Sequence, residues 1–309
     1  MTSIPRIFHF VFGLKPQTEP FHLAHYLCLA SCIAVNRPDT VFFHYQHLPY
    51  GEWWDRIKDQ LTLNRVEGGT FVQSFTYADK RIEAYRYAHQ SDVIRLEMLQ
   101  QYGGIYADMD TLFVQPLPDA FYEKKYIMGR ERVDWAQPAA QQAGGSLCNA
   151  WIAAAPGAEF GKRWLDAMQG AFNGSWSAHS TFLPFSLSRQ HPTLIHVEPE
   201  RSFFHFDWSR RGIRNLFTRQ VTDTAGIYSI HLWSHLWWSR QRTDYTYFHH
   251  ARLTPGYVAF ADTTYARLAR PFFPAHLRPA RPVYRAERQS QLAETVGLFI
   301  HNHTARWRS

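Results

Sequence analysis

Cysteine is scarce in this chain of 309 residues, which contains three. Cys28, Cys32 and Cys148 are too few, and odd in number, for a disulfide-stabilised scaffold; the first two, one helical turn apart, are expected to fill core space. No run of 18 apolar residues is present, so we expect no transmembrane helix. Residues 1–14 have neither the basic leader nor the long apolar stretch of a signal peptide. We expect a protein of the cytoplasm, with peripheral attachment to the inner face of the membrane as a further option.

Two common nucleotide-binding motifs are also missing. The chain contains neither a P-loop nor a G-x-G-x-x-G sequence, and it has no internal repeats. A glycine-rich loop that cradles phosphates is therefore not the means by which this chain would bind a nucleotide. The hydrophobic content of 45% is enough for a sizeable core and excludes a disordered or fibrous protein.

Lysine is absent from residues 201–309, which contain sixteen arginines and six acidic residues. Residues 1–200 contain 17 basic and 20 acidic residues, so the net charge of +7 arises from the last third of the chain. Such a basic region suits an anionic partner, and we expect it to hold an anionic glycan or to contact anionic lipid.

Short apolar runs alternate with helical patterns in the first 130 residues. Strands are expected at residues 7–11, 41–43, 105–107, 126–128 and 147–155, and helices at 21–35, 53–61, 79–102, 159–168 and 287–300. This alternation predicts an α/β fold with a mostly parallel central sheet and helices on both faces. Residues 1–268 are expected to form one domain, on which a Pro-rich segment and a C-terminal amphipathic helix (269–309) pack. Residues 136–146 are Ala/Gln/Gly-rich and are predicted to form a mobile loop, which is our candidate lid.

Two carboxylates follow one of these strands. Asp108 and Asp110 come directly after the predicted strand at 105–107. Carboxylates two residues apart on a strand point to the same side, and oxygen-rich pairs suit Mg²⁺ or Mn²⁺. Ligands of open α/β sheets bind at the carboxyl ends of strands. A D-x-D tripeptide also arises by chance, so a solvated turn is the alternative interpretation.

The preceding helix carries Asp92 and Arg95 three residues apart, hence on one face. A carboxylate beside a guanidinium offers acceptors and donors for a hydroxyl-rich ligand or for phosphate oxygens. The alternatives are simpler: Asp92 with Ser91 would serve a helix N-terminus, and Arg95 would be an exposed helix charge.

Together these residues form the pattern S-D-x-x-R-x-x-x-L-x-x-x-G-G-I-Y-x-D-x-D over residues 91–110. The pattern resembles the glycosyltransferases with a DXD-containing sugar-binding region, among them the yeast-type initiating mannosyltransferases and the α-1,4-galactosyltransferases, and more distantly the clostridial glucosylating toxins. Weaker similarities lie at Ile4–His9, at Asn149–Ile152 with Ala155-Pro156-Gly157, and at His231-x-Trp233 with Trp238. The resemblance implies a GT-A fold, a nucleoside-diphosphate sugar as donor, a saccharide or other hydroxyl acceptor, a divalent metal and retention of anomeric configuration.

The resemblance also implies residue roles. The donor-binding residues would be Asp92, Arg95, Tyr106, Asp108, Phe12, Asn149 and Trp238, and the metal-binding residues Asp110, Asp108 and His231. Asp110 is expected to bind the metal directly, whereas Asp108 would hold ribose hydroxyls or a metal-bound water. Phe12 stands where the family's first strand has a Trp-containing step, and a UDP-sugar is expected in preference to a GDP-sugar. His231 could instead be a histidine of an aromatic cluster, and Asn149 could have a structural role at a strand end. No residue is expected to act as base or nucleophile.

Two other functions fit parts of the sequence. Asp108-Met109-Asp110-Thr111, after a predicted strand, also resembles the nucleophile motif of haloacid-dehalogenase phosphatases. That family needs a later lysine and a later acidic pair, whereas the last lysine here is Lys162 and the later aspartates are isolated. The arginines and aromatic residues of 203–219 alternate as they do in single-stranded nucleic-acid or glycan binding modules. Such a module gives no reason for the residues between Asp92 and Asp110, and we expect no nucleic-acid partner.

Overall fold

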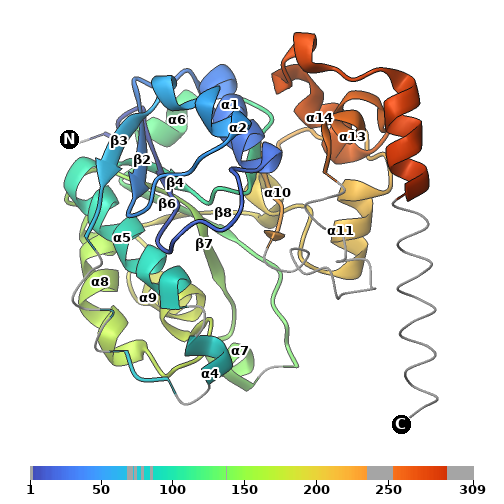
Figure 1. Ribbon diagram of the computed structural model, residues 1–309. Coiled ribbons are helices and arrows are strands. Elements are labelled where there is room, and N and C mark those ends of the chain that lie inside the picture. The colour runs from blue at the N-terminus through green and yellow to red at the C-terminus, as the bar shows by residue number, and fades with distance from the viewer. Residues whose placement is uncertain are drawn as a thin grey trace.

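A seven-stranded β-sheet forms the centre of the protein in the computed structural model (Figure 1). The structure describes residues 3–67, 72, 75–77, 80–83, 86–136, 138–234 and 253–290. Across the sheet the strands are β3 (Thr62–Arg65), β2 (Thr40–Tyr45), β1 (Ile7–Val11), β4 (Gly104–Ala107), β7 (Leu147–Ala154), β6 (Tyr126–Arg130) and β8 (His196–Glu198). Strand β7 runs antiparallel to its neighbours β4 and β6, and all the other pairs are parallel. The predicted mostly parallel sheet is confirmed.

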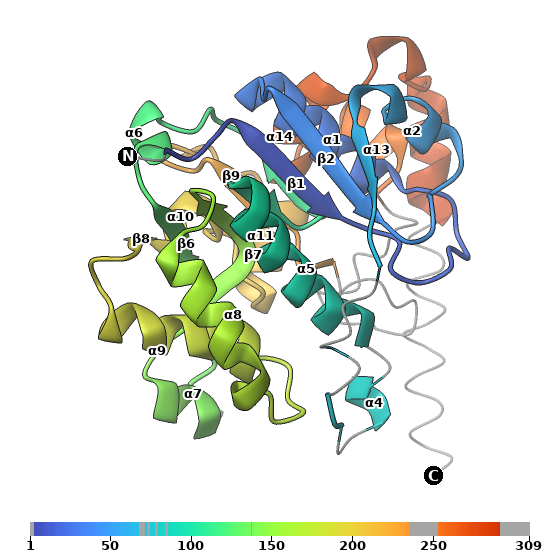
Figure 2. The same cartoon turned by 90° about the vertical axis from the view of Figure 1, so that its left-hand side faces the viewer.

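Helices cover both faces of this sheet (Figures 1 and 2). One face carries α5 (Arg86–Tyr102), α8 (Glu159–Ala171) and α9 (Leu183–Gln190). The other face carries α1 (Leu23–Asn36), α2 (Glu52–Asp55), α10 (Glu200–Phe203), α11 (Arg210–Phe217), α13 (Pro255–Phe260) and α14 (Thr264–Ala269). The shorter elements are η1 (Lys58–Gln60), α4 (Lys80–Glu83), α6 (Asp119–Tyr122), α7 (Pro138–Ala143), the π-helix η2 (Ala178–Phe182), η4 (Arg270–Phe272) and η5 (Ala275–Leu277). No helix in the described part of the chain combines the length and apolarity needed to cross a membrane.

Strand β1 shows why the sheet needs two cores. Phe8 and Phe10 are completely buried in the apolar cluster on the α1 side, whereas Val11 lies in the cluster on the α5 side with Tyr106 of β4. Side chains alternate between the faces of a strand, and a strand covered on both faces reads as a continuous apolar run. The run Ile7–Val11 therefore forms an interior strand of the sheet, paired with β4, the strand that ends at the two carboxylates.

Two buried histidines interrupt the apolar packing of β1 and β2. His9 Nδ1 lies 3.0 Å from His44 Nε2, and His9 Nε2 lies 2.8 Å from the carbonyl oxygen of Gly103. The Asn64 amide nitrogen lies 2.9 Å from His44 Nδ1. If both rings are neutral with the proton on Nε2, all four ring nitrogens are satisfied in one chain of hydrogen bonds. Burial lowers the pKa of His9 to about 4 and that of His44 to about 3, so both are neutral near pH 7.

Gly103 and Gly104 join α5 to β4, as the sequence predicts. Both have positive φ, +64° and +105°, and the Gly103 amide donates to the Leu99 carbonyl at 2.9 Å, which closes the helix. A Cβ on Gly104 would lie 2.4 Å from the Ile7 carbonyl oxygen. Only glycine allows the chain to leave the helix and pair at once with β1.

Three local predictions need correction. Residues 136–146 are not an irregular loop, since α7 forms there; alanine and glutamine favour helices and Pro138 suits a first helical position. The helix expected at 53–61 breaks into α2 and η1 and is followed by the unpredicted edge strand β3. The last helix begins at residue 281 and not at 287, and residues 291–300 of that prediction lie outside the described part of the chain.

Candidate active site

Asp108 and Asp110 lie in a tight turn at the carboxyl end of β4. The turn is closed by a hydrogen bond from the Thr111 amide to the Asp108 carbonyl, 3.1 Å. A short strand, β5 (Thr111–Phe113), follows and pairs antiparallel with β9 (Ser229–His231) in a separate two-stranded sheet. The register places His231 opposite Thr111. Strand pairing thus brings a distant histidine to the D-x-D turn.

His231 faces both carboxylates. Its Nε2 lies 3.0 Å from Asp110 Oδ1 and 3.7 Å from Asp108 Oδ2, and the Ser234 amide donates to Asp110 Oδ2 at 2.7 Å. Burial opposes the charge on Asp110, but His231 and the Ser234 amide outweigh it and hold the pKa of Asp110 well below its usual range. Burial likewise opposes the charge on His231, and Asp110 overcomes it and raises the pKa of His231. Asp110 is therefore an ionised, fixed carboxylate.

Trp233 explains how the Ser234 amide reaches Asp110. Its φ is +55°, a conformation that bulky residues rarely adopt. The indole is buried, donates to the Phe206 carbonyl at 2.8 Å and packs against the His231 ring at 4.3 Å between ring centroids. This packing holds a strained backbone that turns the next amide toward the carboxylate. The aromatic-cluster alternative for His231 is thus correct as far as its packing goes, but the same ring also faces Asp110.

The donor atoms of this group suit a divalent cation. Single ligand atoms of Asp108, Asp110 and His231 all lie within 4.8 Å of one another, close enough to share one ion. Two carboxylate oxygens suit Mg²⁺ or Mn²⁺, and an imidazole nitrogen favours a transition-metal ion over Mg²⁺. The chemistry of these residues therefore fits the metal that the sequence pattern implies.

Asp92 and Arg95 lie in the middle of α5, and both are buried. The guanidinium lies 3.0 Å from Asp92 Oδ1 and 3.3 Å from Asp108 Oδ1, and it donates to the Asn149 carbonyl at 2.7 Å. Burial opposes the charge on Asp92, but Arg95 and His179 outweigh it and lower its pKa. Neither residue is the helix-terminal or exposed charge that the simpler interpretations required. Arg95 instead ties the helix to the D-x-D turn.

Two further side chains complete the hydrogen bonds of Asp92. The Asn149 amide donates to Asp92 Oδ1 at 2.7 Å, and His179 Nε2 lies 3.0 Å from Asp92 Oδ2. Asn149 belongs to β7, and His179 to the π-helix η2. His179 is completely buried. With Arg95, Asp92 therefore has partners from three different elements.

Tyr106 orients Asp108. Its hydroxyl donates to Asp108 Oδ1 at 2.6 Å, and its ring lies under the Arg95 guanidinium, 4.4 Å from the ring centroid. Asp108 keeps 28% of its side chain exposed, while the side chains of Arg95 and Asp110 are almost covered. Asp108 thus presents an oriented carboxylate to solvent at the edge of the group.

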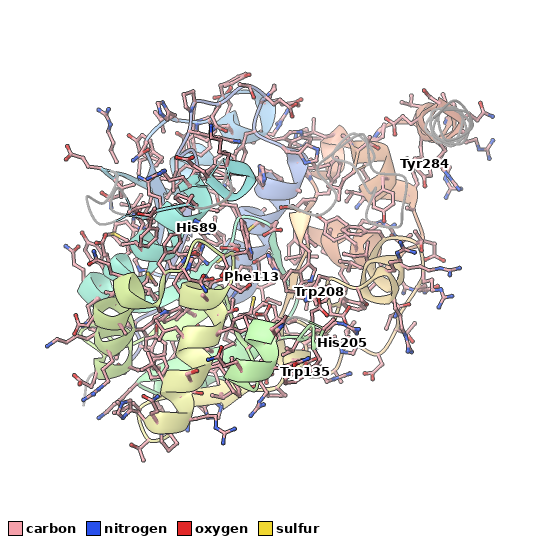
Figure 3. The ribbon with its side chains drawn as sticks, turned by 90° about the horizontal axis from the view of Figure 1, so that it is seen from below. His89, Phe113, Trp135, His205, Trp208 and Tyr284 are labelled. Carbon is pink, nitrogen blue, oxygen red and sulfur yellow. The ribbon has the colours of Figure 1, made fainter. Side chains whose placement is uncertain are left out.

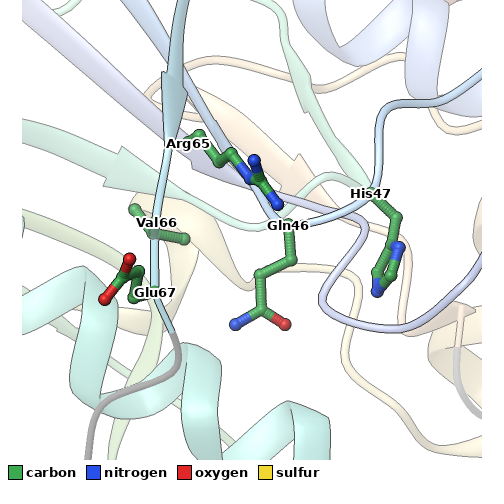
Figure 4. Close-up of a pocket in the computed structure, with 5 residues that line it drawn as sticks. All are labelled: Gln46, His47, Arg65, Val66 and Glu67. Atoms are coloured by element: carbon green, nitrogen blue, oxygen red, sulfur yellow. The ribbon is translucent and has the colours of Figure 1, made fainter.

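These residues surround a cavity of about 590 Å³. Its walls are the segment from β1 to α1 (residues 11–20), the first half of α5, the D-x-D turn, Trp176, and His231 with Ser234. A volume of this size accommodates a ligand as large as a sugar nucleotide. A second cavity of about 440 Å³ lies at the ends of β2 and β3 and is lined by Gln46, His47, Arg65, Val66 and Glu67 (Figure 4). The three candidate metal ligands, Asp108, Asp110 and His231, belong to the larger cavity.

The structure brings most of the predicted site residues to this cavity. Phe12, Arg95, Tyr106, Asp108, Asp110 and His231 line it. Asp92 and Asn149 do not line it and lie behind Arg95. Trp238 lies outside the described residues. Three residues of the site were not predicted: Ser234 and Trp176, which line the cavity, and His179, which contacts Asp92. Residues 136–146, our candidate lid, contribute no wall to the cavity.

Comparison with known proteins agrees with this geometry. A family described as "glycosyltransferase sugar-binding region containing DXD motif" matches residues 37–132, which include Asp92, Arg95, Asp108 and Asp110. "Glucan organizing enzyme 1" of Cryptococcus neoformans var. grubii serotype A is 31% identical over 278 residues, which cover 87% of this chain and 70% of that protein. The chain belongs to the DXD-containing glycosyltransferase family. As a glycosyltransferase of this family it is an enzyme, and its central sheet covered by helices on both faces is the predicted α/β fold. The phosphatase and binding-module interpretations are set aside.

Solved structures of other glycosyltransferases are also similar. The galactosyltransferase LgtC, solved with donor and acceptor sugar analogues, is 12% identical with a TM-score of 0.45, covering 91% of this chain and 99% of its own. The PaToxG glycosyltransferase is 15% identical with a TM-score of 0.44, covering 62% of this chain and 71% of its own. The family assignment rests on the sequence relative and not on these two structures.

Proposed function

We propose that this glycosyltransferase transfers a hexose from a nucleoside-diphosphate sugar, a UDP-sugar in preference to a GDP-sugar, in a metal-dependent reaction that retains anomeric configuration. One observation carries the proposal: the side chains of Asp108, Asp110 and His231, which are close enough together to share one cation, line the same cavity as the fixed guanidinium of Arg95. A diphosphate needs positive charge on one side and a sugar needs oriented hydrogen-bonding groups on the other. This cavity offers both: possible cation ligands on one side and the hydrogen-bonding groups of Arg95 on the other.

The roles of the residues follow from their contacts. Asp110, Asp108 and His231 would hold Mn²⁺, which neutralises charge on the departing diphosphate when bound. Arg95, fixed by Asp92, offers donors to the sugar end of the donor, while Asn149 supports the same ion pair from β7. Asp108 would also meet the ribose, and Phe12, in the segment after β1, would contact the base. Trp238 remains a donor-binding prediction from the sequence.

In the reaction the bond between the anomeric carbon and the diphosphate oxygen breaks, and a bond from that carbon to the acceptor oxygen forms. Retention with departure and attack on one face lets the leaving phosphate accept the acceptor's proton, so that no protein base is required. The chain's own residues then bind the two substrates, orient them toward each other and exclude water from the cavity.

The test is a donor panel. Hydrolysis of UDP-glucose, UDP-galactose, GDP-mannose and related donors is measured with Mn²⁺, with Mg²⁺ and with chelator, and the anomer of the first product is read by NMR. Mn²⁺-dependent hydrolysis of a UDP-sugar with retained configuration is expected. Hydrolysis unaffected by chelator would contradict the metal assignment, and the absence of hydrolysis of every donor would contradict the proposal.

The acceptor and the place of action are part of the proposal. The relative's name concerns glucan, and we propose that the acceptor here is a growing polysaccharide in the cytoplasm, where the three buried free cysteines would stay reduced. Arg210 and Arg211 are exposed on α11, while Ile213, Leu216 and Phe217 bury its opposite face. Exposed Arg285 and Arg288 follow in the helix at 281–290. These arginines would attach the enzyme to anionic lipid at the inner face of the membrane.

A further inference from the structure

Trp176 is an unusual side chain for its position. It is 41% exposed and lines the donor cavity, in the connection between α8 and η2. The other large apolar side chains exposed to this degree in the described part of the chain, Leu48, Tyr50, Leu63, Trp135 and Val283, do not line it. An aromatic side chain that stays partly open to water at the wall of a polar cavity offers a rigid, half-apolar surface on which a ligand ring can pack.

The indole is held in place from the protein side. Its ring lies against the buried His89 ring, with 5.6 Å between centroids and a tilt of 56°. His89 is fixed in turn by a 2.7 Å hydrogen bond between its Nδ1 and the Tyr77 hydroxyl and by packing against His179 and Phe172. The Ser180 hydroxyl donates to the Trp176 carbonyl at 3.0 Å. The exposed part of the indole is therefore presented by a rigid support, which lowers the entropic cost of binding.

The same support leads to the sugar end of the donor site. His89 packs on His179, and His179 holds Asp92, whose partner Arg95 is proposed to contact the donor sugar. Figure 3 shows His89 far from Tyr284, which belongs to the helix at 281–290. A chain of contacts through His89, His179 and Asp92 thus joins Trp176 to Arg95, at the proposed sugar end of the cavity. Phe12, in the segment after β1, also lines the cavity and is the residue proposed to contact the base.

We propose that Trp176 is the platform on which the first ring of a saccharide acceptor stacks; this inference rests on the proposed function. The C–H groups of one pyranose face would lie on the indole, and the indole N–H could donate to a ring hydroxyl. This contact selects a sugar acceptor over a serine, threonine or lipid hydroxyl. It places the acceptor's attacking oxygen beside the donor sugar.

The experiment separates the acceptor from the donor. Transfer to methyl glycosides of glucose, mannose and galactose disaccharides is measured at saturating donor, and donor hydrolysis is measured without acceptor. Trp176→Ala is expected to raise the acceptor KM about tenfold or more while the donor KM changes less than threefold. Trp176→Phe keeps a stacking surface and should recover most of the acceptor affinity.

Trp135→Ala is the matched control, because Trp135 is 54% exposed but lies away from the cavity walls. An unchanged acceptor KM in Trp176→Ala would overturn the inference while normal donor hydrolysis leaves the proposed function intact. A rise in donor KM without a rise in acceptor KM would also overturn it, because the indole would then stack on the nucleobase. Failure of the wild type to hydrolyse any sugar nucleotide would instead overturn the proposed function.

Discussion

His179 Nε2 lies 3.0 Å from Asp92 Oδ2, and the two residues come from a π-helix and from the middle of α5. The contact is buried on both sides, so water cannot replace it. It holds Asp92 in the orientation in which the other carboxylate oxygen meets Arg95 and Asn149. In the proposed donor site His179 would thus act through Asp92, as a positioning residue.

Removing this hydrogen bond should weaken the donor site. His179→Phe keeps the ring volume but leaves one oxygen of a buried carboxylate unpaired, which destabilises the folded state by about 1.5–3 kcal/mol and releases Asp92 from its orientation. We expect kcat/KM for donor hydrolysis to fall about tenfold or more, mainly through KM, because Arg95 loses the partner that fixes it. His179→Gln retains an N–H donor and should recover part of the loss. Equal activity per folded molecule in His179→Phe and wild type, alongside a lower melting temperature, would show a purely structural role.

Asp110 is expected to be essential for turnover. Asp110→Asn removes the charge that faces His231 and the proposed cation while keeping the size of the side chain. Turnover should fall on the order of 10²–10³-fold, the scale of losing one preorganised electrostatic group, and Mn²⁺ affinity measured by calorimetry should fall with it. Asp119→Asn is the control, because Asp119 is 89% exposed in a surface ion pair. Metal-dependent activity within about tenfold of wild type in Asp110→Asn would exclude Asp110 as a ligand.

The histidine pair predicts loss of stability in weak acid. The folded-state pKa values of His9 and His44, about 4 and about 3, lie below the ordinary value of 6.5. The unfolded chain therefore binds more protons below pH 6.5, and stability falls as pH drops from about 6.5 toward 4. We expect the free energy of unfolding to fall by roughly 1 kcal/mol per pH unit for each histidine, as measured by urea unfolding between pH 7 and 5. The double variant His9→Phe, His44→Phe should show a shallower slope, and an unchanged slope would contradict the assignment.

Gly104 should tolerate no side chain. Gly104→Ala combines a positive φ, which costs about 1–2 kcal/mol, with a Cβ 2.4 Å from the Ile7 carbonyl oxygen, which adds about 1–3 kcal/mol or displaces the D-x-D turn. Gly157→Ala is the control, since Gly157 has φ +67° but no atom within 4 Å of the added Cβ. Free energies of unfolding should therefore differ by about 2 kcal/mol between the two variants. Equal losses would show that the close approach to β1 does not matter.

The arginine surface is tested by charge reversal. Arg210→Glu with Arg211→Glu should reduce flotation with phosphatidylserine vesicles by tenfold or more at low salt, and vesicles of phosphatidylcholine should bind neither form. Arg163→Glu with Arg189→Glu is the control, because these exposed arginines lie on α8 and α9, on the other face of the sheet. Equal losses in both variants would indicate an effect of net charge alone. Loss of binding to a soluble anionic glycan with unchanged flotation would assign the surface to that glycan.

Local sequence was enough for the parts of the site that lie close together in the chain. The helix at 86–102, the two glycines and the turn with Asp108 and Asp110 follow one another directly, so helical period, glycine stop and apolar strand predict them together. The strands on either side of β4 were also predicted, because strands buried on both faces read as apolar runs. The edge strand β3 was missed since most of its side chains are exposed and its pattern is not apolar.

The sequence by itself determined the alternation of strands and helices, the carboxylates at the end of β4 and the pairing of Asp92 with Arg95 on one helix face. Only the tertiary structure decided which distant groups complete them: His231 through the β5–β9 register, the Ser234 amide through the strained backbone at Trp233, and His179 through a π-helix. The physical reason is range. Helical and strand periods act over a few residues, whereas the electrostatic environment of a buried carboxylate is set by whatever segments the folded chain packs against it.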